Sequence, residues 1–142
     1  MFFMGTYTPR LDEKGRLFLP AKFRSRLSEG VVVTQGQENC LVVYPEDVFM
    51  QEAARAQQQS MTQRGARDYR RVLFAGADQG VPDKQGRISI PPALRAYAGL
   101  TQDVVVIGVM DRIEIWDPQR WAEYSEQAQA KFADLDEAPQ DE

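Results

Sequence analysis

The sequence predicts a strand-rich α+β fold made of two copies of one unit, with helices beside them. The first observation is an internal repeat, in which residues 11–24 (LDEKGRLFLPAKFR) align with residues 82–95 (PDKQGRISIPPALR) at a shift of 71. The second is a series of short segments in which apolar and polar residues alternate, the period of a half-buried strand. The third is helical spacing of apolar residues between the copies and again near the C-terminus.

A D-x-x-G-R segment opens each copy and predicts a tight turn, because Asp can bond the backbone two residues on and Gly tolerates a positive φ. The residues that are identical in the two copies are Asp12 with Asp83, Gly15 with Gly86, Arg16 with Arg87, Pro20 with Pro91 and Arg24 with Arg95. With one residue inserted, residues 41–44 then align with residues 113–116. So many matches in one order indicate a duplication. Because each half alone is near the size at which a core is marginal, we expect the halves to share one core.

Each copy predicts the same order of elements. The strand after the turn spans residues 16–19 or 87–90, and a proline then begins a short helix, where its missing N–H costs nothing. In the first of these helices Phe23 and Leu27 share the inner face. The two further strands of each copy are predicted at residues 31–34 and 41–44, and at residues 104–107 and 112–116.

Helices are predicted between and after the copies. In the insert, Tyr69, Val72 and Leu73 give an inner stripe, and the arginines on the other side face solvent or pair with an acidic neighbouring subunit; these are Arg64, Arg67, Arg70 and Arg71. Asp117 can cap a C-terminal helix that has Pro118 at its first position. The aromatic and apolar residues that follow at helical spacing, interpreted as core or subunit interface, are Trp121, Tyr124, Ala128, Phe132 and Leu135.

The predicted organisation is a first repeat at residues 5–51, a helical insert at 52–76, a second repeat at 77–124, a C-terminal helix at 117–135 that overlaps its end, and an acidic tail at 136–142 that we expect to be disordered. No apolar run reaches the ~18 residues of a membrane span, and the N-terminus lacks a signal-peptide pattern. We therefore expect no membrane contact and a cytoplasmic location.

Composition argues against most catalytic chemistry. The chain has no His and one Cys, which removes the usual His-based catalytic triads, the commonest transition-metal ligand and a disulfide within the chain. Cys40 lies in strand context and is interpreted as a small buried residue. We expect a protein that is not an enzyme and that has no metal site, cofactor or small-molecule substrate.

The net charge of −4 argues at first against a nucleic-acid partner, but its distribution changes that interpretation. Residues 1–110 hold 14 Lys and Arg against 11 Asp and Glu, whereas residues 111–142 hold 3 against 10. Phosphate attraction depends on the local field, which is screened over ~8–10 Å in physiological salt. A basic face can therefore coexist with a distant acidic end.

The motifs resemble the bacterial MraZ family over nearly the whole chain. The matching features are the Met-Phe start with Gly5-Thr6-Tyr7, both D-x-x-G-R turns, the run RLFLPAKFR at residues 16–24, the segment at residues 40–45 and EIWD at residues 114–117. The sequence departs from the family pattern in two places. An extra residue lies between Phe2 and Gly5, so the first strand is shifted or the chain starts at Met4. In the second turn, Gln85 stands at the position that matches Lys14 of the first turn.

This resemblance implies an AbrB/SpoVT-like swapped-hairpin β-barrel, built here from two copies in one chain. It also implies a DNA-binding transcriptional regulator, a repressor of its own operon in the division and cell-wall gene cluster. Such a regulator binds repeated promoter boxes of double-stranded DNA as a ring-like homo-oligomer, an octamer or similar, in the cytoplasm and on the nucleoid.

The D-x-x-G-R turns divide by role. Asp12, Gly15, Asp83 and Gly86 are assigned to shaping the turns. Arg16 and Arg87 are assigned to DNA, since a pseudo-two-fold axis would put both on one face and Arg can bond guanine O6 and N7 together; the alternative is that each Arg only pairs with its Asp. The remaining basic candidates are Lys14 and Lys84 for phosphate contact, Arg10 and Arg24 for DNA contact or solvent, and Lys22, Arg26 and Arg95 for a solvated helix face.

Two other classes of function compete with DNA binding. In the first, the chain is a ring-forming structural or protein-interaction scaffold whose arginines pair between subunits, which the aromatic C-terminal helix and acidic end would fit. In the second, it is an enzyme with carboxylate-only chemistry from Asp12, Glu13 or Asp83, which lie in turns with no visible partner base.

Overall fold

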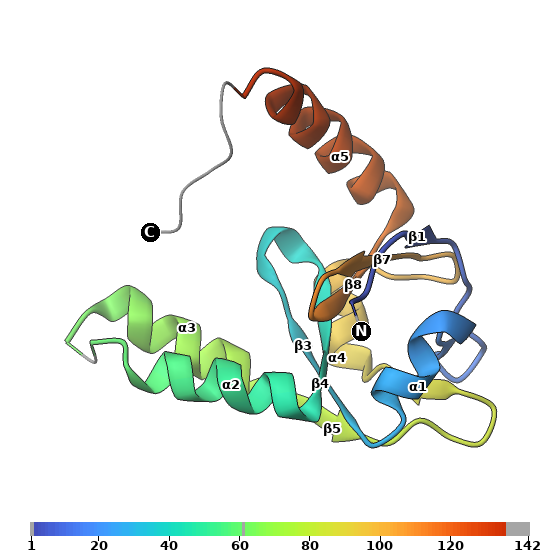
Figure 1. Cartoon of the computed structure of the whole chain (residues 1–142), viewed down its shortest axis with the longest axis horizontal. Helices are drawn as coiled ribbons and strands as arrows, with labels where there is room; N and C mark the ends of the chain where they lie inside the picture. Colours follow the sequence, from blue (N-terminus) through green and yellow to red (C-terminus); the bar gives the residue numbers. More distant parts are fainter. Residues whose placement is uncertain (1, 61, 136–142) are drawn as a thin grey trace.

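The computed structural model describes residues 2–60 and 62–135 of the 142-residue chain, so the expected tail at 136–142 lies outside the described residues. The elements in chain order are β1 (Thr6–Tyr7), β2 (Arg16–Phe18), η1 (Ala21–Phe23), α1 (Arg24–Leu27), β3 (Val31–Gln35), η2 (Gln37–Asn39), β4 (Leu41–Pro45), α2 (Glu46–Gln57), α3 (Arg64–Ala75), β5 (Asp78–Gly80), β6 (Arg87–Ser89), α4 (Pro92–Ala98), β7 (Val105–Val109), β8 (Arg112–Trp116) and α5 (Pro118–Ala133). The fold is α+β and strand-rich, with two repeats and flanking helices (Figure 1).

The two repeats exchange their leading strands. The main sheet has the order β1-β7-β8-β4-β3-β5, and all of its neighbours are antiparallel. Strand β1, which precedes the first turn, pairs with β7 of the second repeat. Strand β5, which precedes the second turn, pairs with β3 of the first repeat. Each repeat therefore completes the sheet of the other, and β4 with β8 joins the two hairpins at the centre.

A second, two-stranded sheet is formed by β2 and β6, one strand from each repeat. Within the described ranges, β1 and β5 remain the open edges of the six-stranded sheet, and the strand order does not close on itself. The strand pairing therefore does not confirm the swapped-hairpin barrel that the resemblance implies.

The core is shared by the two repeats, as expected for halves near the size at which a core is marginal. Its main cluster takes apolar residues from both, including Phe3, Leu17, Leu41, Ile88 and Ile113, all at most 4% exposed. Because Leu17 and Ile88 are register partners in the β2–β6 sheet, this small sheet has one face on the core and the other toward solvent.

Helix α2 begins at Glu46, because Pro45 ends β4 and the acidic Glu46 and Asp47 favour a helix N-terminus. One helix differs from the expected one. The inner stripe predicted for α3 is largely wrong. Leu73 is buried, but Val72 is 50% exposed and Tyr69 is 40% exposed, so the described chain does not cover these two side chains.

Helix α5 starts as expected and then leaves the body of the molecule. The Asp117 carboxylate accepts a hydrogen bond from the Arg120 backbone N–H at 3.0 Å, and Pro118 occupies the first turn. Trp121 lies against Trp116, with 5.2 Å between the ring centroids. Beyond these contacts the helix projects away (Figure 1), and none of its residues is buried. No helix among the described residues has the length and apolar composition to cross a bilayer.

Candidate nucleic-acid interface

The first turn is held by the carboxylate of Asp12. Its Oδ1 accepts the backbone N–H groups of Lys14 and Arg16, each at 2.9 Å, and its Oδ2 accepts the Arg16 Nε at 2.7 Å. The Gly15 N–H donates to the Asp12 carbonyl at 3.0 Å, and Gly15 has a φ of +75°. One side chain therefore fixes both the turn and the direction of the arginine that follows it.

The second turn repeats this geometry bond for bond. The Asp83 Oδ1 accepts the backbone N–H groups of Gln85 and Arg87, each at 2.9 Å, and its Oδ2 accepts the Arg87 Nε at 2.7 Å. Gly86 has a φ of +76°. The turn keeps its geometry although Gln85 stands where the first turn has Lys14. Only the backbone N–H of this residue bonds to the Asp carboxylate.

Both carboxylates are stabilised in their charged form. The backbone N–H of Arg16 is the largest cause that lowers the pKa of Asp12, and the Arg16 side chain adds to it against partial desolvation. The backbone N–H of Arg87 lowers the pKa of Asp83 in the same way. A catalytic acid or base works best with a pKa near the working pH, and the lowered pKa moves both carboxylates away from that range.

The two arginines lie on one outer face of the β2–β6 sheet. Arg16 pairs with Ser89 and Phe18 with Arg87, and residues directly opposite each other point to the same side. Leu17 and Ile88 between them point into the core, so the four pairing residues face outward. Arg16 and Arg87 are diagonal neighbours across the two strands, and the Cα atoms of such neighbours are about 7–8 Å apart.

Each guanidinium uses Nε for its Asp and keeps its two terminal nitrogens without a hydrogen bond or ion pair to the described chain. Their side chains are 29% and 20% exposed, respectively. The Arg87 guanidinium also lies over the Phe18 ring, 5.7 Å from its centroid. Ser89 is the corresponding neighbour of Arg16, so the two otherwise equal arginines differ in what supports them.

The repeats hold each other's turns through a reciprocal pair of backbone bonds. The Leu19 N–H donates to the Gly86 carbonyl and the Ile90 N–H donates to the Gly15 carbonyl, each at 2.9 Å. These bonds extend the β2–β6 pairing into both turns. The spacing between the two arginines is thereby set by backbone contacts between the repeats.

A second reciprocal contact comes from the short helices. The Arg24 guanidinium lies against Gly86, where an added Cβ would come within 2.6 Å of its Nε. The Arg95 guanidinium lies against Gly15, where an added Cβ would come within 2.7 Å of its Cζ. Both arginines donate from Nε to a carbonyl of their own repeat, that of Leu19 or Ile90. Each turn is thus covered by an arginine of the other repeat.

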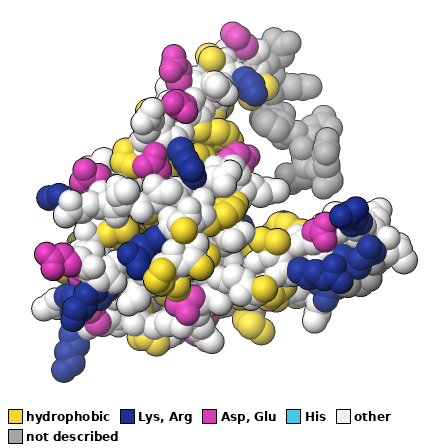
Figure 2. Space-filling view, turned by 180° about the vertical axis from the view of Figure 1, so that it is seen from behind, with side chains coloured by type: hydrophobic (Ala, Val, Ile, Leu, Met, Phe, Trp, Pro, Cys, Tyr) yellow, Lys and Arg dark blue, Asp and Glu magenta, His cyan; other side chains and the backbone are white. Residues whose placement is uncertain are grey.

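The remaining predicted cations lie around this face with fewer constraints. Lys14 and Lys84 are exposed, and their side chains make no hydrogen bond or ion pair within the described residues. Arg10 pairs with Asp103 at 3.1 Å, with both side chains more than 60% exposed, so this contact is weak and open to competition. Figure 2 shows Lys and Arg side chains also gathered at the α2–α3 end of the molecule.

The comparisons with known proteins agree with this duplicated architecture. The family model "MraZ protein, putative antitoxin-like" matches the chain twice, over residues 2–72 and residues 73–142. The two matches begin 71 residues apart, the shift that aligns the two turns. The chain belongs to the MraZ family.

Similar MraZ proteins cover almost all of the chain. A protein named "Transcriptional regulator MraZ" from Nocardioides sp. is 76% identical over 98% of this chain and 96% of its own length. Relatives with the same name from Cutibacterium acnes and Salinispora tropica are 50% and 54% identical, over 94% and 95% of this chain and equal shares of their own.

One expectation about the basic residues of this MraZ chain was wrong. Arg95 is half-buried against the turn of the first repeat, not on a solvated helix face. Arg26 remains partly exposed, and it forms a bidentate ion pair with Asp47, at 3.1 and 2.9 Å. The match of Arg24 with Arg95 in the repeat alignment was the signal that could have assigned Arg95 the same role as Arg24.

Among the described residues, no group of three or more Asp, Glu or Cys is placed to hold a metal ion. Cys40 is buried, as expected, and burial raises the pKa of its thiol to about 12. A protonated, inaccessible thiol is a poor nucleophile.

Proposed function

We propose that this chain is a DNA-binding transcriptional regulator whose β2–β6 sheet presents Arg16 and Arg87 to base edges in a major groove. The observation that carries the proposal is that both arginines face outward from one two-stranded ribbon, in a register set by backbone bonds. A major groove admits a two-stranded ribbon. The names of the relatives, transcriptional regulators, support the same class of function.

The way each arginine is held suits guanine recognition. With Nε engaged by Asp12 or Asp83, the side chain is fixed in direction and its terminal nitrogens remain for a partner. Arginine commonly bonds guanine O6 and N7 together. The proposed role of Asp is therefore to aim the arginine, which reconciles the ion pair within the turn with contact to DNA.

Phosphate contacts are proposed for the cations around the ribbon. Lys14 and Lys84 lie exposed in the turns, next to the arginines that would read bases. Arg24 covers the second turn and Arg10 has only an exposed ion pair, so both are placed to add to the same field. Such contacts position a protein on DNA without reading its sequence.

Assembly would convert weak single contacts into specific binding. We propose that the chain forms a homo-oligomeric ring, an octamer or similar, that binds repeated boxes of its own promoter in the division and cell-wall cluster. Several modules on spaced repeats raise avidity by ~10²–10⁴. A ring bound there would occlude polymerase and repress transcription, in the cytoplasm and on the nucleoid.

The exchange of β1 and β5 between the repeats supports the swapped-hairpin architecture. We propose repeats at residues 5–51 and 77–124, joined by the helical insert at 52–76.

The test is a titration of the duplex upstream of the gene against a scrambled duplex, over a range of salt concentrations. The proposal predicts tighter binding of the upstream duplex and a loss of about 1–3 kcal/mol per base contact in Arg16→Ala. Lys14→Ala should lower the salt slope by about 1 and weaken both duplexes alike. Equal affinity for the two duplexes would contradict specific regulation.

A ring scaffold without specific DNA binding is the second candidate, favoured by the exposed apolar stripe of α5. Light scattering on the double variant Arg16→Ala, Arg87→Ala separates the two functions. An assembly that persists while DNA binding is lost supports regulation, whereas loss of the assembly supports the scaffold.

A further inference from the structure

A large apolar side chain lies beside the two arginines on the outer face of the β2–β6 sheet. Phe18 stands two residues after Arg16 on β2, so both side chains point to the same side. Its register partner is Arg87, and the residue is 42% exposed. The repeat alignment places Ser89 at the equivalent position of the second repeat. The two arginines match each other in the repeats, whereas their neighbours on the same face differ.

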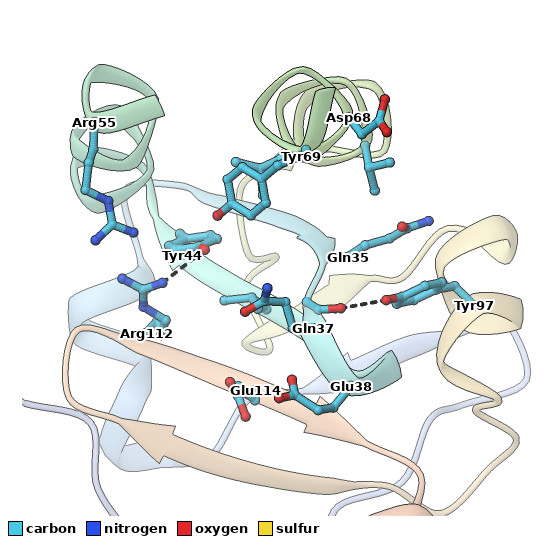
Figure 3. A pocket seen from close by; sticks show the side chains of 15 residues that line it. Gln35, Gln37, Glu38, Tyr44, Arg55, Asp68, Tyr69, Tyr97, Arg112 and Glu114 are labelled. Carbon is cyan, nitrogen blue, oxygen red and sulfur yellow. Dashed lines mark hydrogen bonds between the residues drawn. The ribbon is translucent and has the colours of Figure 1, made fainter. Parts of the chain in front are cut away.

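A second arginine–aromatic pair of the chain shows how such a contact is built when it holds the fold. The Arg112 guanidinium lies over the Tyr44 ring, 4.8 Å from its centroid, and Tyr44 is 2% exposed. Figure 3 shows the hydrogen bond from Arg112 to the Tyr44 hydroxyl, 3.1 Å long, and the other terminal nitrogen of Arg112 bonds Glu52. The Phe18 ring beneath Arg87 is exposed instead, and the terminal nitrogens of Arg87 have no such bond to the described chain. The pair on the ribbon is therefore open to a partner on both its apolar and its polar side.

An exposed ring in this place fits an apolar group on the edge of a base. In a major groove, thymine presents its 5-methyl group, and phenylalanine is one of the side chains that contact it. Register partners such as Phe18 and Arg87 have Cβ atoms about 4.5–5.5 Å apart. Successive base pairs are about 3.4 Å apart along the DNA axis. A base that touches Phe18 would therefore lie within about two base pairs of the base that Arg87 reads.

We infer that Phe18 is a specificity-determining residue of the DNA site, and that its ring contacts the 5-methyl group of a thymine near the guanine bound by Arg87. The inference rests on the proposed function and adds a second kind of base to it. Contact between the ring and the methyl group removes apolar surface of both from water, which favours thymine over bases without that methyl group. Ser89 offers no comparable apolar surface, so this preference belongs to the first repeat.

The test compares the duplex upstream of the gene with the same duplex in which deoxyuridine, which lacks the 5-methyl group, replaces every thymidine. Anisotropy measures the binding of both duplexes by wild type and by Phe18→Ser. This variant gives the first repeat the residue that the second repeat has at the same position. The replacement should weaken wild type about fourfold more than Phe18→Ser for each methyl group that the ring buries. The ratio of the two losses isolates the contact between ring and methyl group.

Two controls separate this contact from changes in fold or in DNA shape. Phe18→Ser should melt near wild type, because Phe18 is exposed and β6 already carries a serine at the equivalent position. Val109→Ser is the matched variant, since Val109 lies in a strand outside the ribbon, β7, and is 40% exposed. It should lose as much affinity with deoxyuridine as wild type does.

The outcomes distinguish the inference from the proposed function. If deoxyuridine weakens wild type and Phe18→Ser equally, the ring contacts no thymine methyl group and the inference is overturned. It is also overturned if wild type prefers the upstream duplex to a scrambled one but does not respond to deoxyuridine, and the proposed function then stands. Phe18→Ser that binds both duplexes more weakly, by the same factor, would mean that the ring only supports Arg87. If wild type binds upstream and scrambled duplexes equally, the proposed function fails and the inference fails with it.

Discussion

The guanidinium of Arg95 lies against Gly15, a residue 80 positions earlier in the chain and in the other repeat. Arg24 lies against Gly86 in the same way. Together with the Ile90–Gly15 and Leu19–Gly86 backbone bonds, these contacts make each turn depend on both repeats. The duplication therefore sets the spacing and direction of the two arginines that we propose for DNA.

Substitution of Gly15 should destabilise the chain. The Gly15→Ala variant places a Cβ at a φ of +75° and against the Arg95 side chain, and we expect a cost of about 1–2 kcal/mol from the backbone conformation. Gly65→Ala is the matched control, since it lies in α3 with open space around it, and it should be neutral or stabilising by up to about 1 kcal/mol. Denaturant unfolding measures both. Equal effects would show that the turn does not need glycine.

Loss of Arg95 should affect the turn of the opposite repeat. Arg95→Ala removes the hydrogen bond to the Ile90 carbonyl, 3.0 Å long, and we expect a loss of about 0.5–1.5 kcal/mol in unfolding free energy. The Gly15 amide should also exchange its hydrogen faster. Lys22→Ala, at an exposed position of the equivalent helix, should stay within about 0.5 kcal/mol of wild type. An unchanged exchange rate at Gly15 would argue against the contact between repeats.

Charge alone should not replace Arg16. The Arg16→Lys variant keeps a cation but loses the planar fork that can bond Asp12 and a base together. We expect the promoter duplex to lose about 1–3 kcal/mol of binding free energy, while the scrambled duplex and the salt slope change little. Lys22→Arg, at an exposed position of the first repeat, is the control and should bind like wild type. A wild-type preference for the promoter in Arg16→Lys would contradict base reading by this side chain.

Acid should weaken the turns. Folding lowers the pKa of Asp12 and Asp83 from the usual 3.8, so their contribution to stability is present above that value and is lost as the pH falls toward the lowered pKa. The melting temperature of wild type should therefore drop between about pH 5 and pH 2. The double variant Asp12→Asn, Asp83→Asn should show a smaller drop over the same range. If the melting temperatures of wild type and the double variant fall equally with pH, the two carboxylates are not the cause of the acid sensitivity.

The turns and most of the elements could be predicted from the sequence because they are local. In each turn, Asp, Gly and Arg lie within five residues, and the contacts among them follow from the backbone that they themselves shape. The outward face of Arg16 and Arg87 could be predicted from the repeat, since equivalent strands related by a two-fold axis present equivalent residues.

Contacts between distant segments could not be predicted in the same way. Nothing near Arg95 in the sequence indicates that it lies against Gly15. The contact of Phe18 with Arg87 depends on the register of two strands 71 residues apart. The stripe of α3 was predicted to face inward because spacing shows which residues share a face but not what covers them. In the structure, Val72 and Tyr69 of this stripe are 50% and 40% exposed.

The central claim is that Arg16 and Arg87 read guanine bases. Its most direct test is a double-mutant cycle that combines an arginine variant with a base analogue in the DNA. Guanines in the promoter boxes are replaced by 7-deazaguanine, which lacks the N7 acceptor, and binding is measured by anisotropy for wild type and for Arg16→Ala, Arg87→Ala. The account predicts that the analogue weakens wild type by about 1–3 kcal/mol per contacted base and leaves the double variant unaffected. If the analogue weakens both proteins equally, these arginines do not read the bases.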